Sequence, residues 1–129
     1  MTFIAWNESL DLDIVAIDEG HKAMINIMNN LYEQNKAGKS KETIKATLSE
    51  LSSFATLQFS EEEDYMASIN FPDLAAHRAI HQRLLEKISN FSREYSENSG
   101  TIPDEFLTFL KLWINSHIKG VDIKYAKAS

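Results

Sequence analysis

The chain has 129 residues, the size of one ordinary domain, and it contains no cysteine. Disulfide bonds, thiolate zinc sites and iron–sulfur clusters are therefore excluded, and any bound metal must be held by imidazole, carboxylate or amide groups. The net charge of −6 and the dispersed basic residues disfavour nucleic acid as a partner.

An irregular arm, from Met1 to about Ile17, is the first predicted element. It lacks the basic segment and the long apolar run of a signal peptide, and no later segment is apolar enough to predict a membrane span. We therefore expect a cytoplasmic, monomeric protein without a membrane anchor, in which residues 1–129 form one domain.

Two predicted helices follow the arm. The first runs from about Asp18 to Lys36 and stops at Gly38, a residue type that favours the end of a helix. The second begins after Ser40, whose hydroxyl is a suitable N-cap, and continues to about Ser68.

Proline marks the start of each of the two remaining predicted helices. The third opens at Phe71-Pro72-Asp73 and ends near Asn98-Ser99-Gly100. The fourth opens at Thr101-Ile102-Pro103-Asp104 and reaches about Lys119 before Gly120. No segment shows strand alternation, and the short loops predict an all-α, antiparallel up-down-up-down four-helix bundle with an irregular N-terminal arm.

Polar side chains interrupt the apolar faces of the predicted helices. Steps of three and four residues define these faces, as with Leu74, Leu84 and Ile88 in the third helix. The polar residues at such steps are His21, Gln58, Glu62, His77, His81 and His117. In an up-down-up-down bundle they lie toward one end, and buried polar groups need partners. The pattern therefore predicts a metal site in the core, near one end of the bundle.

Asp122 is a candidate second carboxylate beside Glu62. Five residues of an ideal helix turn a side chain to about 140° from its starting direction, so a regular helix would aim Asp122 away from His117. We expect Gly120 to break the helix and let Asp122 fold back. Carboxylate pairs with imidazoles hold two iron or two manganese ions in helix bundles. The alternatives are a helix cap for Asp122 and a cation at a helix C-terminus for His117.

Five stretches with characteristic spacing cover nearly the whole chain. They are Trp6 with Leu10, Ile17-Asp18-x-x-His21-Lys22, Phe59-x-x-Glu62-Glu63-x-x-Met66, Phe71-Pro72-Asp73-Leu74-x-x-His77-x-x-x-His81 and Trp113-Ile114-x-x-His117-Ile118-x-x-x-Asp122-x-x-Tyr125. In this order and spacing they resemble the bacterial hemerythrins, which are four-helix proteins that bind dioxygen at a non-haem di-iron centre. The combined pattern is highly specific, whereas each piece alone would be weak.

The resemblance implies two non-haem iron ions that are bridged by an oxo or hydroxo group. It assigns the first iron to His77, His81 and His117. It assigns the second iron to His21 and the residue at position 58, and it makes Glu62 and Asp122 the bridging carboxylates. Dioxygen or a small anion would then bind at the open position of the second iron.

Two residues depart from the family pattern. Gly20 stands where the family usually has Gln, and Gln58 stands where it has a ligand histidine. Because an amide oxygen is a weaker donor than imidazole, three outcomes are open. Gln58 binds the second iron weakly, or it swings away and leaves a further open position, or the second iron is lost. Glu61 is an alternative substitute ligand; otherwise Glu61 and Asp64 belong to a solvated face.

Reversible dioxygen binding, for storage, delivery or sensing, is the expected function. The alternatives are a di-iron peroxidase or oxidase, a nitric-oxide-handling protein, and a bundle depleted of one or both metals. More open positions on the second ion favour reactive chemistry over storage. We therefore expect bound dioxygen to be less stable than with histidine at position 58, with faster autoxidation or peroxidase-like turnover.

Overall fold

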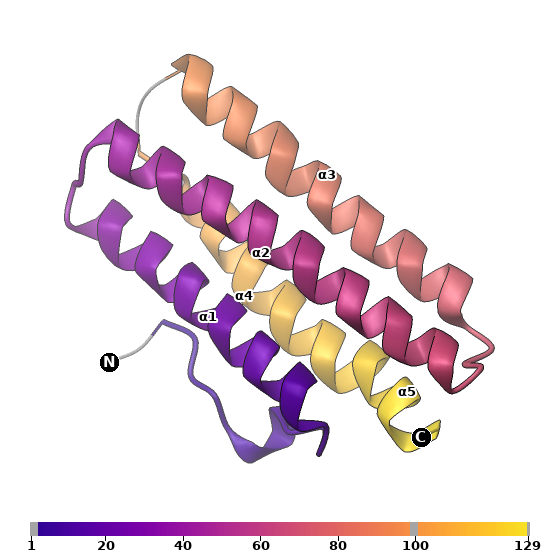
Figure 1. Ribbon diagram of the computed structural model, residues 1–129. Coiled ribbons are helices and arrows are strands. Elements are labelled where there is room, and N and C mark those ends of the chain that lie inside the picture. Colours follow the sequence, from indigo (N-terminus) through magenta and orange to yellow (C-terminus); the bar gives the residue numbers. More distant parts are fainter. Residues whose placement is uncertain (1–2, 99–100, 129) are drawn as a thin grey trace.

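Four long helices form an antiparallel bundle in the computed structural model, which describes residues 3–98 and 101–128 (Figure 1). They are α1 (Val15–Lys36), α2 (Lys41–Ser68), α3 (Leu74–Asn98) and α4 (Asp104–His117). The shorter elements are η1 (Glu8–Leu10), the π-helix η2 (Ile118–Asp122) and α5 (Ile123–Ala128). The described ranges contain no strand. The predicted all-α four-helix bundle is confirmed.

The turn between α1 and α2 follows the predicted chemistry. Gly38 has a φ of 68°, which a glycine adopts without steric cost. The N–H groups of Gly38 and Lys39 donate to the carbonyls of Asn35 and Gln34, and this pattern terminates α1. Ser40 then accepts a hydrogen bond from the Thr43 N–H at 3.2 Å, so it is the N-cap of α2. At the far end of α3, Ser99 and Gly100 of the predicted helix end lie outside the described residues.

The core of the bundle is apolar along most of its length. Phe91 of α3 stacks on Phe106 of α4, with ring centroids 3.8 Å apart, and this contact joins the two helices away from the polar end. The fully buried apolar side chains of the long helices include Met24, Met28, Leu31, Leu51, Ile88 and Ile114. Within the described ranges, none of the helices combines the length and the apolar character needed to cross a membrane.

The N-terminal arm packs along α1 (Figure 1). The Asn29 side chain of α1 pairs with the backbone of Ile4, accepting from its N–H at 2.8 Å and donating to its carbonyl at 2.9 Å. Asp18 accepts hydrogen bonds from the N–H groups of Leu12 and Ile14, at 2.9 and 3.3 Å. These contacts tie the irregular arm to α1.

Asp122 reaches the site through a π-helix and not through a helix break. The chain continues in helical conformation from α4 through η2 into α5, and the Ile123 N–H donates to the carbonyl of Ile118, five residues earlier. The wider turn of a π-helix brings residues that are five apart onto the same face. Asp122 therefore lies on the same helical face as His117, one turn further along. The predicted break at Gly120 is wrong. The fifth residue of the spacing between His117 and Asp122 is accommodated by a wider helical turn and not by an interruption of the helix.

Candidate metal centre

The start of α1, the end of α2, the start of α3 and the junction of α4 with α5 lie at one end of the bundle (Figure 1). All seven predicted site residues contact one another in this part of the bundle. Their side chains are almost inaccessible, with exposed fractions between 0% and 4%. They are His21, Gln58, Glu62, His77, His81, His117 and Asp122. The common depth that the sequence predicts is therefore present.

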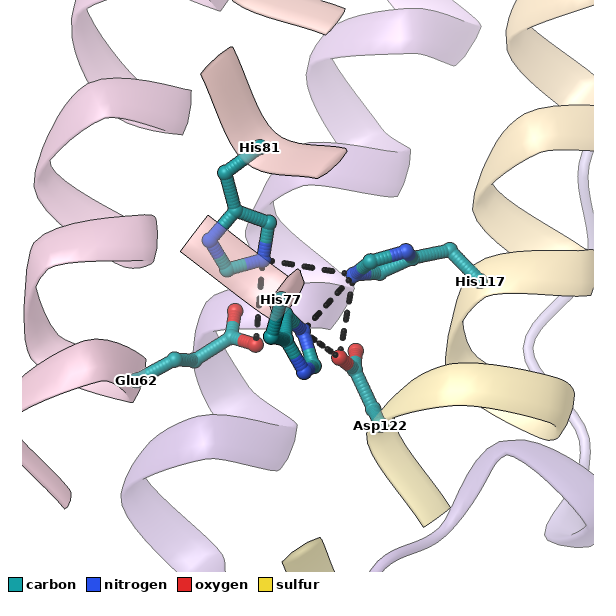
Figure 2. Close-up of side chains that lie close together, drawn as sticks. All are labelled: Glu62, His77, His81, His117 and Asp122. Carbon is teal, nitrogen blue, oxygen red and sulfur yellow. Dashed lines mark hydrogen bonds and ion pairs between the residues drawn. The ribbon is translucent and has the colours of Figure 1, made fainter. Parts of the chain in front are cut away.

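Three imidazoles direct their Nε2 atoms toward one point, as Figure 2 shows. The Nε2 atom of His117 lies 3.2 Å from that of His77 and 3.3 Å from that of His81. A neutral imidazole has one donor and one acceptor nitrogen, so these three atoms cannot all satisfy one another. A cation between them satisfies all three lone pairs.

Each of the two carboxylates points one oxygen toward these imidazoles and the other toward His21. Asp122 places Oδ1 at 2.9 Å from His77 Nε2 and 3.0 Å from His117 Nε2, and Oδ2 at 3.2 Å from His21 Nε2. Glu62 places Oε1 at 3.9 Å from His81 Nε2, and Oε2 at 3.2 Å from His21 Nε2. The pair therefore spans two neighbouring positions, one beside three imidazoles and one beside a single imidazole.

The donor set fits metal ions. One ligand atom from each of five residues lies within 4.8 Å of all the others, and the five are Glu62, His77, His81, His117 and Asp122. Both oxygens of Asp122 are buried and make no hydrogen bond of acceptable geometry, although imidazole nitrogens lie close by. A buried carboxylate needs compensating positive charge, which the surrounding imidazoles supply when protonated and a metal cation supplies when they are neutral.

The charges of the site are mutually dependent. Burial alone would raise the pKa of Asp122, but the side chains of His117, His21 and His77 outweigh it and hold that pKa well below its usual range. Burial also raises the pKa of Glu62, as does the Asp122 charge. Burial lowers the pKa of His81 to about 4, so this imidazole is neutral near pH 7 and keeps a lone pair for a cation.

The Hemerythrin HHE cation binding domain family model matches residues 12–128 of the chain. The chain belongs to the hemerythrin family. This family binds non-haem iron, and the cluster described above is a group that can hold a metal.

Relatives of the chain carry the hemerythrin name. The bacteriohemerythrin of Clostridium acetobutylicum is 33% identical over 93% of this chain and 96% of its own length. That of Stenotrophomonas maltophilia is 25% identical over 98% of this chain and 81% of its own, and the hemerythrin-like protein of Naegleria gruberi is 29% identical over 93% and 88%. A crystal structure of wild-type hemerythrin has a TM-score of 0.89 at 22% identity, over 98% of this chain and 97% of that chain, which shows a shared fold.

Gln58 lies at the edge of this hemerythrin-family site with its amide nitrogen toward Glu62. The Nε2 atom donates to Glu62 Oε2 and to the carbonyl of Ile17, both at 3.2 Å. The amide oxygen of Gln58 lies on the other side, beside Gly20.

Glu63 is a functional neighbour that sequence reasoning missed. Its Oε2 atom lies 2.9 Å from His81 Nδ1, and its Oε1 atom accepts from Arg78 Nε at 3.0 Å. When Nδ1 of His81 carries the proton, Nε2 is the free acceptor that faces the site. The signal was available, because Glu63 adjoins Glu62 near the end of α2, beside the antiparallel α3 that carries His81, and a metal-binding histidine usually has a carboxylate or carbonyl on its other nitrogen.

Tyr125 is a second missed contributor, although it belongs to the hemerythrin-like motif. Its hydroxyl donates to Glu62 Oε1 at 3.0 Å, and its side chain is fully buried. Burial raises the pKa of Tyr125 far above its usual range, so the phenol remains protonated and donates to the carboxylate.

Two aromatic rings hold the imidazoles in place. Phe59 stacks on His81 with ring centroids 3.8 Å apart, and Trp113 stacks on His117 at 4.3 Å. These two rings therefore restrict the directions of two candidate ligands.

Proposed function

We propose that this chain binds two non-haem iron ions in the centre described above and binds dioxygen reversibly, for storage, delivery or sensing. The observation that carries the proposal is the placement of Glu62 and Asp122. Each carboxylate offers one oxygen to the group of three imidazoles and the other to His21. Membership of the hemerythrin family supports the choice of iron.

The side chains divide naturally between two ions. His77, His81 and His117 would hold the first ion, and His21 would hold the second. Glu62 and Asp122 would contribute to both. Two adjacent irons would supply the two electrons that dioxygen takes up when it binds.

The protein would protect this chemistry by excluding water. Met24, Met28 and Ile114 are fully buried on the inner faces of α1 and α4, and Phe59 is 3% exposed. Apolar walls of this kind limit proton delivery and hydrolysis at a reactive centre. Tyr125 and Glu63 would keep the ligands oriented while the charge of the centre changes.

Iron analysis followed by an aerobic absorption spectrum tests the proposal. The purified, iron-loaded protein should contain two irons per chain and form an oxygenated species in air. Removing oxygen should return the absorption spectrum to that of the protein before oxygen was added. His81→Ala should lose iron, whereas Gln82→Ala should not, because Gln82 is the exposed neighbour of His81 on the same helix. About one iron per chain in the parent would contradict the dinuclear centre.

A di-iron peroxidase, oxidase or nitric-oxide-handling protein is the second candidate. The orientation of Gln58 favours it, because an amide nitrogen directed at Glu62 offers no ligand atom and would leave the second ion with His21 and the two carboxylates. An extra open position admits exogenous ligands. Steady-state turnover of hydrogen peroxide with a reductant, together with rapid loss of the oxygenated species, would support this candidate over an oxygen carrier.

A further inference from the structure

Gly20 and Gln58 face each other across the contact between α1 and α2, and the space between them admits no additional atom. A Cβ atom at position 20 would overlap Oε1 and Cδ of Gln58 and would lie 2.7 Å from Nε2. Gly20 is buried and its φ is not in the left-handed region, so its backbone would accept alanine. A larger residue at position 20 would therefore have to displace the end of the Gln58 side chain, whereas the helix backbone imposes no such restriction.

The amide nitrogen of Gln58 is fully engaged in this position. The side chain is 2% exposed, and its nitrogen donates to Glu62 and to the Ile17 carbonyl. An amide NH₂ group has two protons, so both are used. The oxygen, which is the atom of an amide that binds cations, lies against Gly20.

We propose that Gly20 and Gln58 are a matched pair in which Gln58 is a positioning residue for Glu62 and not a metal ligand. Gly20 provides the space into which the amide folds, and the amide then holds the Glu62 oxygen that faces His21. This inference rests on the proposed di-iron function: with Gln58, the second ion would have one protein ligand fewer than it would have with a histidine at position 58. It would therefore keep one more exchangeable position for a small anion or dioxygen.

The pair predicts a specific consequence for Gly20→Ala. In the parent, the new methyl group must expel the Gln58 amide from its place and break its two hydrogen bonds. In Gln58→Ala, the three atoms nearest to the new methyl group are absent, and alanine is a better helix former than glycine. The two backgrounds should therefore respond differently to one substitution.

A double-mutant cycle on the metal-free protein tests the pair without any metal chemistry. Thermal unfolding of the parent, Gly20→Ala, Gln58→Ala and the double variant should show a non-additivity of roughly 3–6 °C in Tm. Gly120→Ala is the matched control, because a Cβ there meets nothing within 4 Å and its effect should add to that of Gln58→Ala. Additive effects of Gly20→Ala and Gln58→Ala would overturn the matched pair.

Iron loading tests the assignment of Gln58 as a non-ligand. Gln58→Ala should retain two irons per chain, with the second-iron affinity lowered by about 10- to 100-fold, the usual effect of losing the hydrogen-bond partner of a ligating side chain, whereas His21→Ala should lose the second iron altogether. An equal loss in both variants would make Gln58 a ligand and overturn the proposal. If the parent itself binds no iron pair, the proposed function fails, while the thermal cycle still reports on the Gly20–Gln58 contact.

Discussion

The tautomer of His81 depends on one carboxylate outside the cluster of candidate ligands. Glu63 lies 2.9 Å from Nδ1 of this imidazole, and Arg78 holds the other oxygen of Glu63. With the proton kept on Nδ1, Nε2 remains available on the side of His77 and His117. The stacked ring of Phe59 restricts the remaining rotation of the imidazole.

Glu63→Ala should therefore lower iron affinity by about 10- to 100-fold, the usual effect of removing a hydrogen-bond partner from a metal-binding histidine. Glu63→Gln should lose much less, because an amide oxygen can still accept from Nδ1–H. Competition with a coloured iron chelator measures both. Glu61→Ala is the control, since Glu61 is exposed two residues away. An equal loss in that variant would point to general surface charge or to Glu61 as a substitute ligand.

Tyr125→Phe should destabilise the protein without changing its shape. The phenol donates to the fully buried Glu62 carboxylate, and a hydrogen bond to a charged group contributes about 2 kcal/mol. Thermal or urea unfolding should show this loss. Tyr32→Phe is a suitable comparison, because within the described residues Tyr32 contacts its neighbours through its ring. No difference between the two variants would show that the Tyr125 hydroxyl is dispensable.

The burial and clustering of the candidate ligands could be predicted from the sequence, but the direction of Gln58 could not. His21, Glu62, His77 and His81 follow helical steps that any single helix reveals. The orientation of an amide depends on which atoms face it from another helix, and here that atom is the missing Cβ of Gly20. In the sequence, Gly20 is only a departure from the family pattern. Its role, to leave space for the Gln58 amide, depends on the contact between α1 and α2.

At the level of elements, η2 determines whether Asp122 reaches the site. A regular α-helix would turn Asp122 to about 140° from His117, whereas the observed π-helix keeps the two residues on one face. Helix ends such as Gly38 and Ser40 were predictable because their capping signals are local. A π-helix has no capping residue that marks it in the sequence. Its only trace is that His117 and Asp122 are five residues apart, one more than the three or four residues that an α-helix places on one face.

Inserting and deleting one residue at Gly120 should have opposite consequences. Deletion leaves Asp122 four residues after His117, and four residues of an α-helix return to within about 40° of the starting direction. The deletion variant should therefore keep two irons per chain. Insertion of one alanine after Gly120 makes the separation six residues and turns Asp122 away, so iron should be lost. Circular dichroism should show both variants helical, and loss of iron from both would contradict this account of η2.

At the level of the whole molecule, the apolar core along the bundle stabilises a fold whose buried polar cluster, at one end, is unfavourable without a cation. The two carboxylates Glu62 and Asp122 and four imidazoles are buried together there, and both Asp122 oxygens are left without hydrogen bonds. The rest of the core, with the arm fastened to α1, holds these groups close in spite of that cost. Metal binding and folding should therefore be coupled.

Removal of iron should lower the thermal stability of the protein, and returning iron should restore it. A ligand that binds only the folded state at about 1,000 times its Kd stabilises that state by about 4 kcal/mol, which corresponds to roughly 10–20 °C in Tm for a domain of this size. Ferrous iron added without oxygen should give this rise, whereas Ca²⁺ should not, because it binds oxygen ligands and the cluster is rich in imidazole. His81→Ala should reduce the rise caused by iron. A Tm that is the same with and without iron would mean that the buried carboxylates and imidazoles satisfy one another in the folded chain.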